Sequence, residues 1–426
     1  MEASWEQVPN IVLVQVFSRL SDSDRLSASL VCQKWRQIFR YPSLWRTRCF
    51  DISRGHTGED ARAIAFARSL GPCLKQLYVI LNHPTYIGCR RAQKTMTSLL
   101  SRLYGKAQLA EFVMPHLEMD RFWKYDSVRD RLFRSLARFL RGQRRLRAFD
   151  MSGASVMPSE GYLLLAAVAK NSGATVRDLN IEEYFRPRHP VFLSETFNEL
   201  MGQFSNLHKL SISYNCMSDE LLASLASTCA GRLSHVTVRC YKTEPHHQKI
   251  YGQQWKNLCR VCPKLKVKYC LERIRAYSEI KLMLVPEIPL YHLQIWAGYE
   301  SSQIDWRVCD TIDYITTNFC DTLEHVSLEY DESTEFIDDR LLALVSRCRH
   351  LEHMDVNAVL QLATVDTLLN QQKEYKIGLL GCHIVVCGLT EHGTERLSDI
   401  MQQHQEWLDE RGVDFRCTSD HALHHQ

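Results

Sequence analysis

A short apolar phrase recurs along the chain from residue 74 onward, and it constrains the fold more than any other feature. Its pattern is Leu-x-x-Leu-x-Val, with other large apolar residues substituting at each apolar position. Clear copies begin at Leu74, Leu146, Val176, Leu207, Leu233, Leu290, Leu323 and Leu351, and weaker ones at Leu109 and Leu265. Successive copies start 25 to 37 residues apart, a period typical of one strand plus one helix. Because such a repeat buries its apolar face only against its neighbours, the pattern predicts a solenoid.

Helical patterns separate the strand phrases. The clearest runs from Met217 to Leu225, where Ser218 or Asp219 can cap the helix, and a similar pattern starts at Ile337. In four repeats a cysteine precedes the next phrase by three or four residues, at Cys229, Cys262, Cys320 and Cys348. A small apolar side chain at a helix end would pack inward there. These features resemble a leucine-rich repeat of the cysteine-containing type, which implies a parallel sheet on the concave side with helices outside.

We expect a degenerate leucine-rich-repeat solenoid over residues 51–389. Residues 390–412 are predicted to form a terminal amphipathic helix, since Leu397, Ile400, Trp407 and Leu408 recur at helical spacing. Residues 413–426 are predicted to be a tail.

Residues 1–50 carry a different pattern. Apolar residues recur at helical spacing from Val12 to Leu20, a Ser-Asp run follows, and a second apolar stripe extends from Leu26 to Ile38. A unit this small cannot bury all of these side chains against itself. The surplus packs either on the rest of the chain or on a partner protein.

The spacing of these residues resembles the F-box over residues 4–48. The motif positions are occupied by Val8-Pro9, Val16-Phe17, Leu20, Asp24 to Leu26, Leu30-Val31-Cys32, Trp35 and Leu44-Trp45. Val8 stands where Leu is usual, and Ile11 where an acidic residue is frequent. The resemblance implies docking to the Skp-type adaptor of a cullin–RING ubiquitin ligase. By position, the side chains that form or support this interface would be Pro9, Val16, Phe17, Leu20, Leu26, Val31, Cys32 and Trp35.

The two resemblances together predict an α/β chain in which a three-helix F-box precedes an irregular solenoid. They imply a non-catalytic substrate receptor of an SCF-type ligase, linked to cullin and RING subunits through the adaptor and presenting an unknown protein target on the repeats. The alternative is a scaffold that binds the adaptor but delivers no substrate.

An arginine-rich segment covers residues 129–147. Leu132, Leu136 and Leu140 would form one helical face, and the face with Arg138 and Arg141 would lie opposite. That basic face is either the solvated outside of a repeat helix or an anion surface for an acidic or phosphorylated substrate. Nucleic-acid binding is the weaker alternative, because aromatic residues suited to base stacking are sparse.

The segment from Tyr184 to Phe192 interrupts the strand–helix rhythm with two prolines and three aromatic residues. Tyr184, Phe185, Arg186 and Arg188 are therefore candidate substrate contacts. The equal alternative is that the segment covers an edge of the solenoid.

Nothing in the sequence points to catalysis or a cofactor. Cys259 and Cys262 have zinc-ligand spacing, but no second C-x-x-C pair exists, so we interpret them as core cysteines. No P-loop, H-E-x-x-H or G-x-S-x-G motif occurs. Sixteen cysteines without a secretion signal are typical of reduced thiols, so we expect a cytoplasmic or nuclear protein. No apolar run is long enough to predict a membrane span.

The charge is polarised along the chain. Residues 301–426 contain 9 Lys and Arg against 23 Asp and Glu, whereas residues 1–300 contain 43 against 26. Such a chain can attract different partners at its two ends, or can simply carry two differently solvated surfaces.

Overall fold

A computed structural model describes residues 8–53, 58–81, 85–121, 123, 125–274, 276–298, 307–330 and 335–420. The chain divides into two compact units. Unit 1 comprises residues 1–186 and 199–207, and unit 2 comprises residues 187–198 and 208–426. Residues 1–7 of the predicted F-box and 421–426 of the predicted tail lie outside the described residues.

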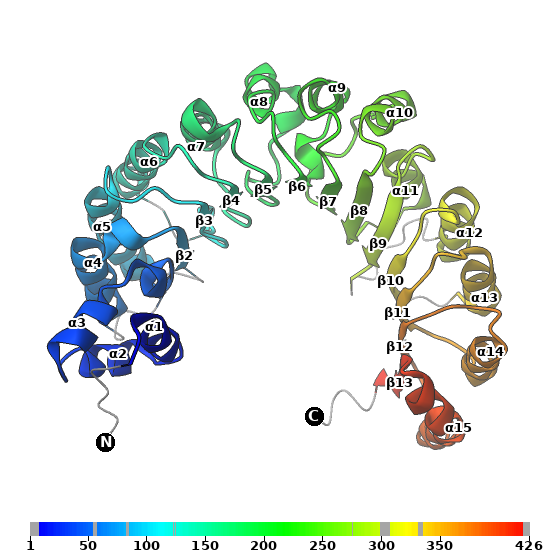
Figure 1. The fold of residues 1–426 in the computed structure, drawn as a ribbon. Coiled ribbons are helices and arrows are strands. Elements are labelled where there is room, and N and C mark those ends of the chain that lie inside the picture. The colour runs from blue at the N-terminus through cyan, green and yellow to red at the C-terminus, as the bar shows by residue number, and fades with distance from the viewer. Residues whose placement is uncertain are drawn as a thin grey trace, which may run out of the picture. The chain divides into compact units, whose positions relative to one another are not determined.

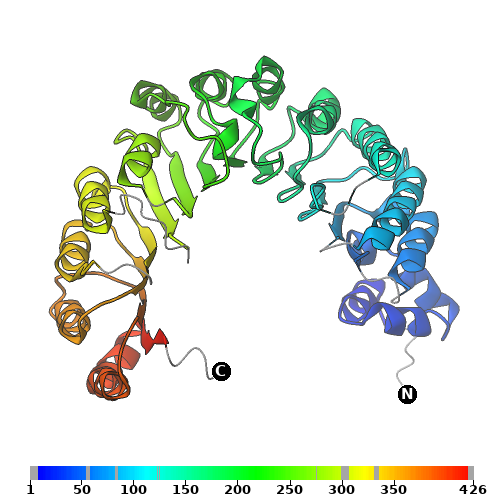
Figure 2. The same cartoon turned by 180° about the vertical axis from the view of Figure 1, so that it is seen from behind.

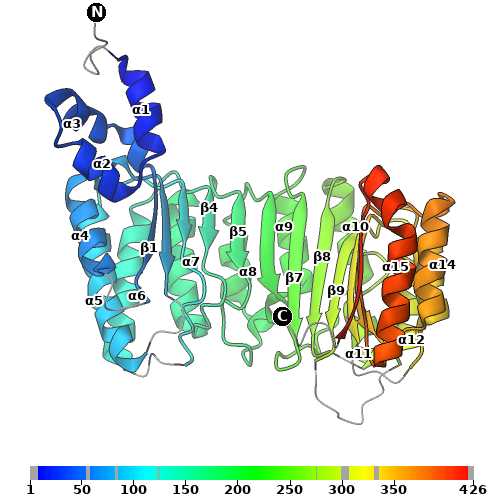
Figure 3. The same cartoon turned by 90° about the horizontal axis from the view of Figure 1, so that it is seen from below.

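Unit 1 begins with three short α-helices and a 3-10 turn, and then alternates strands with helices (Figure 1). The first group is α1 (Asn10–Ser18), α2 (Asp22–Ala28), α3 (Gln33–Phe39) and η2 (Pro42–Trp45). The strands are β1 (Thr47–Asp51), β2 (Gln76–Ile80), β3 (Glu111–Val113), β4 (Ala148–Asp150) and β5 (Asp178–Ile181). The intervening helices are α4 (Glu59–Ser69), η3 (Gly71–Cys73), α5 (Tyr86–Leu103), α6 (Asp126–Arg141) and α7 (Pro158–Ser172). Figure 3 shows α1–α3 beyond one end of β1.

The strands of unit 1 pair in parallel and in chain order, and helices cover one face of the sheet. Leu77, Phe112, Phe149 and Leu179 occupy equivalent register positions on successive strands, and all four are buried. The Phe112 and Phe149 rings are stacked, with centroids 6.1 Å apart. The apolar positions of the strand phrase therefore form a continuous ladder under the helices.

Unit 2 repeats the same arrangement (Figure 2). Its strands are β6 (Lys209–Ser213), β7 (His235–Tyr241), β8 (Lys266–Glu272), β9 (Leu290–Trp296), β10 (His325–Tyr330), β11 (His353–Ala358), β12 (Gly381–Val386) and β13 (Asp414–Ser419). Its helices are η4 (Val191–Leu193), η5 (Tyr214–Cys216), α9 (Asp219–Thr228), α10 (Gly252–Val261), α11 (Tyr277–Met283), α12 (Val308–Phe319), α13 (Asp338–Arg347), α14 (Leu362–Lys373) and α15 (Glu391–Arg411). Helix α8 (Glu195–Met201) contains the change from unit 2 to unit 1. The eight strands pair in parallel, each with the next in the chain.

The predicted fold class is confirmed: N-terminal helices precede repeats of a parallel strand and a helix. A strand follows each of the ten phrase starts, the weak copies at Leu109 and Leu265 included. The predicted cysteines Cys229, Cys262, Cys320 and Cys348 each directly follow a helix as its C-cap. Three of them are buried and Cys320 is half-buried.

The predicted tail needs a correction. Asp414–Ser419 forms strand β13, which pairs with β12 in register from Gly381↔Asp414 to Val386↔Ser419. Phe415 is buried, so strand β13 contributes to the core. The preceding helix α15 lies within the predicted range and ends at Arg411, and the positive φ of Gly412 suits a glycine C-cap.

In the described part of the chain, no helix is long and apolar enough to cross a bilayer.

Candidate functional site

The three opening helices are delimited by local capping contacts. The Ser21 side chain accepts a hydrogen bond from the Asp24 amide at 3.2 Å, which starts α2. The Cys32 Sγ accepts from the Trp35 amide at 3.4 Å at the start of α3. The Ser-Asp run therefore breaks one helix and caps the next, as its sequence indicates.

Aromatic packing forms the interior of this small bundle. Phe17 is 1% exposed, and its ring meets that of Trp35 edge to face with centroids 5.6 Å apart. Trp45 is also buried and contacts Phe39 in a similar geometry. Leu13, Ala28, Ile38 and Leu44 are buried as well. These contacts hold the helices together; Phe17 and Trp45 are buried by them, whereas Trp35 and Phe39 are half-buried.

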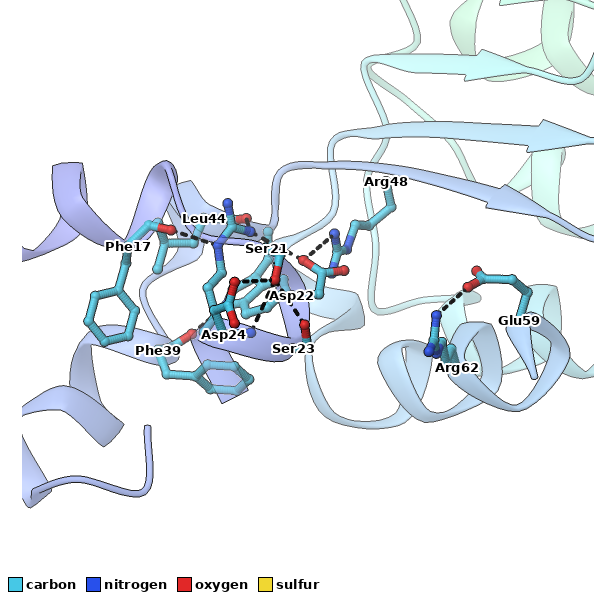
Figure 4. Close-up of polar contacts among 12 residues, drawn as sticks. Phe17, Ser21, Asp22, Ser23, Asp24, Phe39, Leu44, Arg48, Glu59 and Arg62 are labelled. Carbon is cyan, nitrogen blue, oxygen red and sulfur yellow. Dashed lines mark hydrogen bonds and ion pairs between the residues drawn. The ribbon is translucent and has the colours of Figure 1, made fainter. Parts of the chain in front are cut away.

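A second set of contacts ties the helices to the first strand. The Arg25 guanidinium donates to the carbonyl oxygens of Phe17 (2.7 Å), Ser18 (3.0 Å) and Leu44 (3.3 Å). The Asp22 carboxylate accepts hydrogen bonds from both terminal guanidinium nitrogens of Arg48, at 3.0 and 2.6 Å (Figure 4). Arg25 thus satisfies carbonyl groups at the end of α1 that have no partner within the helix.

Large apolar side chains remain uncovered on the opening helices. Their exposed fractions are 72% for Ile11, 42% for Val12, 41% for Val16, 56% for Leu26, 70% for Leu30 and 67% for Val31. With Tyr41, seven of the fifteen large apolar side chains exposed in the described residues lie between residues 8 and 48. That segment is about a tenth of the chain, so exposed large apolar side chains are concentrated there, as is typical of a surface that meets a partner. We call these six aliphatic residues the exposed F-box set.

The predicted adaptor-binding residues divide between this surface and the interior. Pro9, Val16, Leu26 and Val31 are exposed, whereas Leu20, Cys32 and Trp35 are half-buried and Phe17 is buried. Phe17 therefore supports the surface from beneath. The prediction did not include Ile11, Val12 or Leu30, although the helical spacing of buried Leu13 and Phe17 places Ile11 and Val12 away from the interior.

The predicted basic face of α6 is present. Arg138 and Arg141 are exposed, and the Arg138 guanidinium lies 4.9 Å from the centroid of the Tyr104 ring. Arg138 also lines a hollow of about 300 Å³ with Arg131 and Arg134. Arg129 is different, because it is buried and pairs with Glu160 at 2.6 Å.

The predicted contact segment at residues 184–188 needs a correction. Tyr184 and Phe185 are 0% and 2% exposed, and the Tyr184 hydroxyl donates to the Gly161 carbonyl at 3.1 Å. Both rings are therefore core side chains and cannot contact a substrate in this structure. Arg186 is half-buried and Arg188 is exposed, so only the arginines of this set reach the surface.

The C-x-x-C pair lies on and beyond α10. Cys262 is buried and donates its thiol to the Cys229 carbonyl at 3.5 Å, and Cys259 is half-buried. Burial raises the pKa of the Cys259 thiol. Among the residues that the structure describes, no three His, Cys, Asp or Glu side chains are grouped as a metal site would require.

Comparison with known proteins agrees with this architecture. Residues 5–51 match the F-box-like family model. The chain is similar to F-box/LRR-repeat protein 21 of Mus musculus (21% identical over 299 residues) and of Ovis aries (23% over 305 residues). In both cases the match covers 68% of this chain and 64% of the relative, so it spans less than two thirds of the relatives' length.

Among solved structures, the leucine-rich repeat-containing protein LegL7 from Legionella pneumophila is similar at 10% identity and a TM-score of 0.40. That similarity covers 74% of this chain and 91% of LegL7. The chain thus has an F-box-like domain and is distantly homologous to F-box/LRR-repeat protein 21.

Proposed function

We propose that this protein is a substrate receptor of an SCF-type ubiquitin ligase, with the opening helices docked on the Skp-type adaptor and a protein target held on the repeats. The F-box-like match and the repeat architecture support this role in general. The observation that carries it is the exposed F-box set, which this protein's described residues leave uncovered. Aliphatic side chains presented on short helices fit a partner's hydrophobic groove.

The division between interior and surface explains how the docking would work. Phe17 and Trp35 fix the angle between α1 and α3, and the Arg25 contacts fix the helix ends. The exposed aliphatic residues are then already in fixed positions before docking, so little conformational entropy is lost when the adaptor binds.

The proposed mechanism is positional. The adaptor links the chain to the cullin and RING subunits, and the repeats keep a target lysine near the ubiquitin-carrying enzyme. Tethering raises the effective concentration of that lysine, and this subunit forms no covalent intermediate. We propose a cytoplasmic or nuclear location, which suits a chain with sixteen cysteines.

The finer assignment is to a subtype. The phrases at residues 179–185 and 214–222 resemble F-box only protein 39, in which an F-box also precedes a leucine-rich-repeat-like half. For the target surface, Arg138 and Arg141 of α6 are proposed contacts, together with Arg186 and Arg188.

Co-purification tests the proposed role. Adaptor and cullin should accompany the tagged protein from cells, and Leu26→Glu/Val31→Glu should abolish both. Phe336→Glu/Leu380→Glu is the matched control, because these side chains are 66% and 57% exposed in unit 2. Equal recovery of the adaptor by all three proteins would refute the assignment.

The alternative scaffold role predicts a different result in cells. A receptor's bound proteins should accumulate when it is depleted, and the accumulation should be reversed by the wild-type chain but not by Leu26→Glu/Val31→Glu. For a scaffold that delivers no substrate, the levels of bound proteins should stay unchanged.

A further inference from the structure

A row of residues at the beginning of the unit 1 strands is held in register by backbone hydrogen bonds. The Ala110 amide donates to the Lys75 carbonyl (2.6 Å), that of Arg147 to Ala110 (2.6 Å) and that of Arg177 to Arg147 (2.7 Å). Each of these residues directly precedes a strand, from β2 to β5. Neighbouring strands lie about 4.8 Å apart, so three cationic residues stand within about 15 Å along one edge of the sheet.

These cations line a hollow with a volume of about 520 Å³. Arg145 adds a fourth positive side chain to Lys75, Arg147 and Arg177, and all four are exposed. The remaining lining residues are small or neutral: Gln108, Ala110, Ala174, Thr175 and Asn206. The alanine in the middle of the row leaves room between the charged side chains, because it has no side chain beyond Cβ. We call this hollow the basic edge pocket.

The positive charge of the pocket is not neutralised from within the described part of the chain. No carboxylate lines the hollow, and no ion pair between described residues involves its four cations. Elsewhere in unit 1, Arg48, Arg91 and Arg129 each pair with a carboxylate. Glu111 begins the adjacent strand β3 but accepts from the Tyr78 hydroxyl at 2.7 Å.

The neutral polar groups of the pocket are already used by the protein. Gln108 donates to the Gly142 carbonyl and accepts from the Arg144 amide, and the Thr175 hydroxyl donates to the Leu146 carbonyl. These contacts fix the walls, while Lys75 makes only a long contact of 3.5 Å to the Gln108 carbonyl. The neutral walls are therefore fixed by hydrogen bonds, while the four cationic side chains are exposed to solvent. Recognition of an anion requires such exposed, charged donors.

We propose that the basic edge pocket binds a phosphorylated segment of a protein partner. Guanidinium groups present paired donors that match phosphate oxygens, and a phosphoserine supplies nearly two negative charges. No aromatic side chain lines the hollow, which disfavours base stacking by a nucleic acid. No large apolar side chain lines it either, which disfavours insertion into a membrane surface.

The position of the pocket gives it a role in the ligase. The same row of hydrogen bonds starts at Arg46, whose carbonyl accepts from the Lys75 amide at 2.7 Å, and Arg46 directly follows η2 of the opening helices. A phosphorylated target would therefore bind along the sheet edge from which the adaptor-binding helices extend. That interpretation rests on the proposed receptor function, whereas phosphate recognition by the pocket does not.

Fluorescence anisotropy with the full-length protein tests the pocket. The probe is a fluorescein-labelled glycine–serine peptide carrying two phosphoserines, and the same peptide without phosphate is the reference. We expect the phosphopeptide to bind more tightly, and Arg147→Glu/Arg177→Glu to weaken binding about tenfold or more, as loss of charge-assisted hydrogen bonds implies. Arg147→Lys/Arg177→Lys should give an intermediate loss, because it keeps the charge and removes the fork.

Arg68→Glu/Lys94→Glu is the matched control, since it changes the net charge by the same amount at two exposed positions on the outer helices α4 and α5. Equal weakening by both reversals, or equal binding of the two peptides, would overturn the proposal. Tighter binding of a single-stranded oligonucleotide or of phosphoinositide vesicles through the same arginines would also overturn it. Adaptor binding should be unchanged in every pocket variant, so failure here is distinguishable from failure of the receptor function.

Discussion

The rings of Phe17 and Trp35 meet edge to face, 5.6 Å apart and at an interplanar angle of 84°. This contact joins α1 to α3 and separates the structural side chains of the opening helices from those left for a partner. The distinction decides which substitutions unfold the helices and which affect only docking.

Phe17→Ala should destabilise the opening helices by about 3–5 kcal/mol, because it opens a cavity beneath α1 and removes the aromatic contact with Trp35. Val16→Ala, one residue away and 41% exposed, should change the free energy of unfolding by less than about 1 kcal/mol. Urea unfolding monitored by tryptophan fluorescence compares the two. Equal midpoints would show that Phe17 is not the interior residue described here.

Arg25→Ala should destabilise the same helices by about 2–3 kcal/mol, since three carbonyl groups lose a hydrogen bond from a charged donor. Arg25→Lys should recover little of this loss, because an ammonium group cannot reach the three acceptors as a guanidinium fork does. Asp22→Ala is the comparison: its carboxylate is 57% exposed, so its removal should cost about 1 kcal/mol or less. The free energy of unfolding of each variant provides the measurement, and a larger loss for Asp22→Ala would reverse our ranking.

A row of stacked imidazoles makes unit 2 sensitive to acid. His292, His325 and His353 occupy paired positions on β9, β10 and β11, with ring centroids 5.3 and 4.7 Å apart. Burial lowers the pKa of His292 from 6.5 to about 4, and Lys268 adds to the effect. Burial, together with the neighbouring His353, also lowers the pKa of His325.

In the folded state His292 and His325 therefore remain neutral at a pH where the same side chains of the unfolded chain already bind protons. The stability they contribute is fully present above the unfolded pKa of about 6.5 and is lost as the pH falls toward about 4. The melting temperature should fall between about pH 7.5 and about pH 5, and His292→Gln should reduce that fall. His392→Gln is the control, because its ring is 79% exposed. An unchanged pH profile for His292→Gln would contradict the role assigned to this row.

Strand β13 pairs with β12 along its whole length, so its removal should be costly. A chain ending at Gly412 loses the buried Phe415 and leaves the edge of β12 unpaired. We expect a loss of at least about 2 kcal/mol and increased aggregation. A chain ending at Asp420 keeps β13 and should behave as the 426-residue chain in thermal unfolding and light scattering. If residues 413–420 had no structural role, the two truncated chains would give the same thermal unfolding and light scattering.

The strands of the repeats could be predicted because their signal is local. The alternation in Leu207 to Ile212 directly encodes one buried face and one exposed face. Strands β1 and β13 escaped prediction because each carries a single large apolar residue, Phe50 or Phe415, between polar ones. They become strands by pairing with β2 and β12, which is information from distant parts of the chain.

The burial of Tyr184 and Phe185 could not be predicted from their aromatic, proline-rich context. The chain turns at Glu183, which has a positive φ of 50°, and Phe185 then bridges to Val156. A Cβ on Gly161 would lie 2.3 Å from the Phe185 ring, so this glycine makes the room for it. The turn and the fit to a residue over twenty positions away are tertiary properties.

Three cations of the basic edge pocket share one position in the strand phrase. Lys75, Arg147 and Arg177 all occupy the second position of the strand phrase, directly after its first apolar residue. The solenoid aligns equivalent positions of successive repeats at one sheet edge, so a shared position in the phrase indicates that these three side chains lie close together.

The affinity of the purified chain for the Skp-type adaptor tests the central claim most directly. Isothermal titration calorimetry should give tight binding for the wild type and for Phe336→Glu/Leu380→Glu. For Leu26→Glu/Val31→Glu we expect binding weakened about thirtyfold or more with the fold intact, the loss typical of interface hot spots. Unchanged affinity for that variant, or no adaptor binding by the folded wild type, would contradict the account.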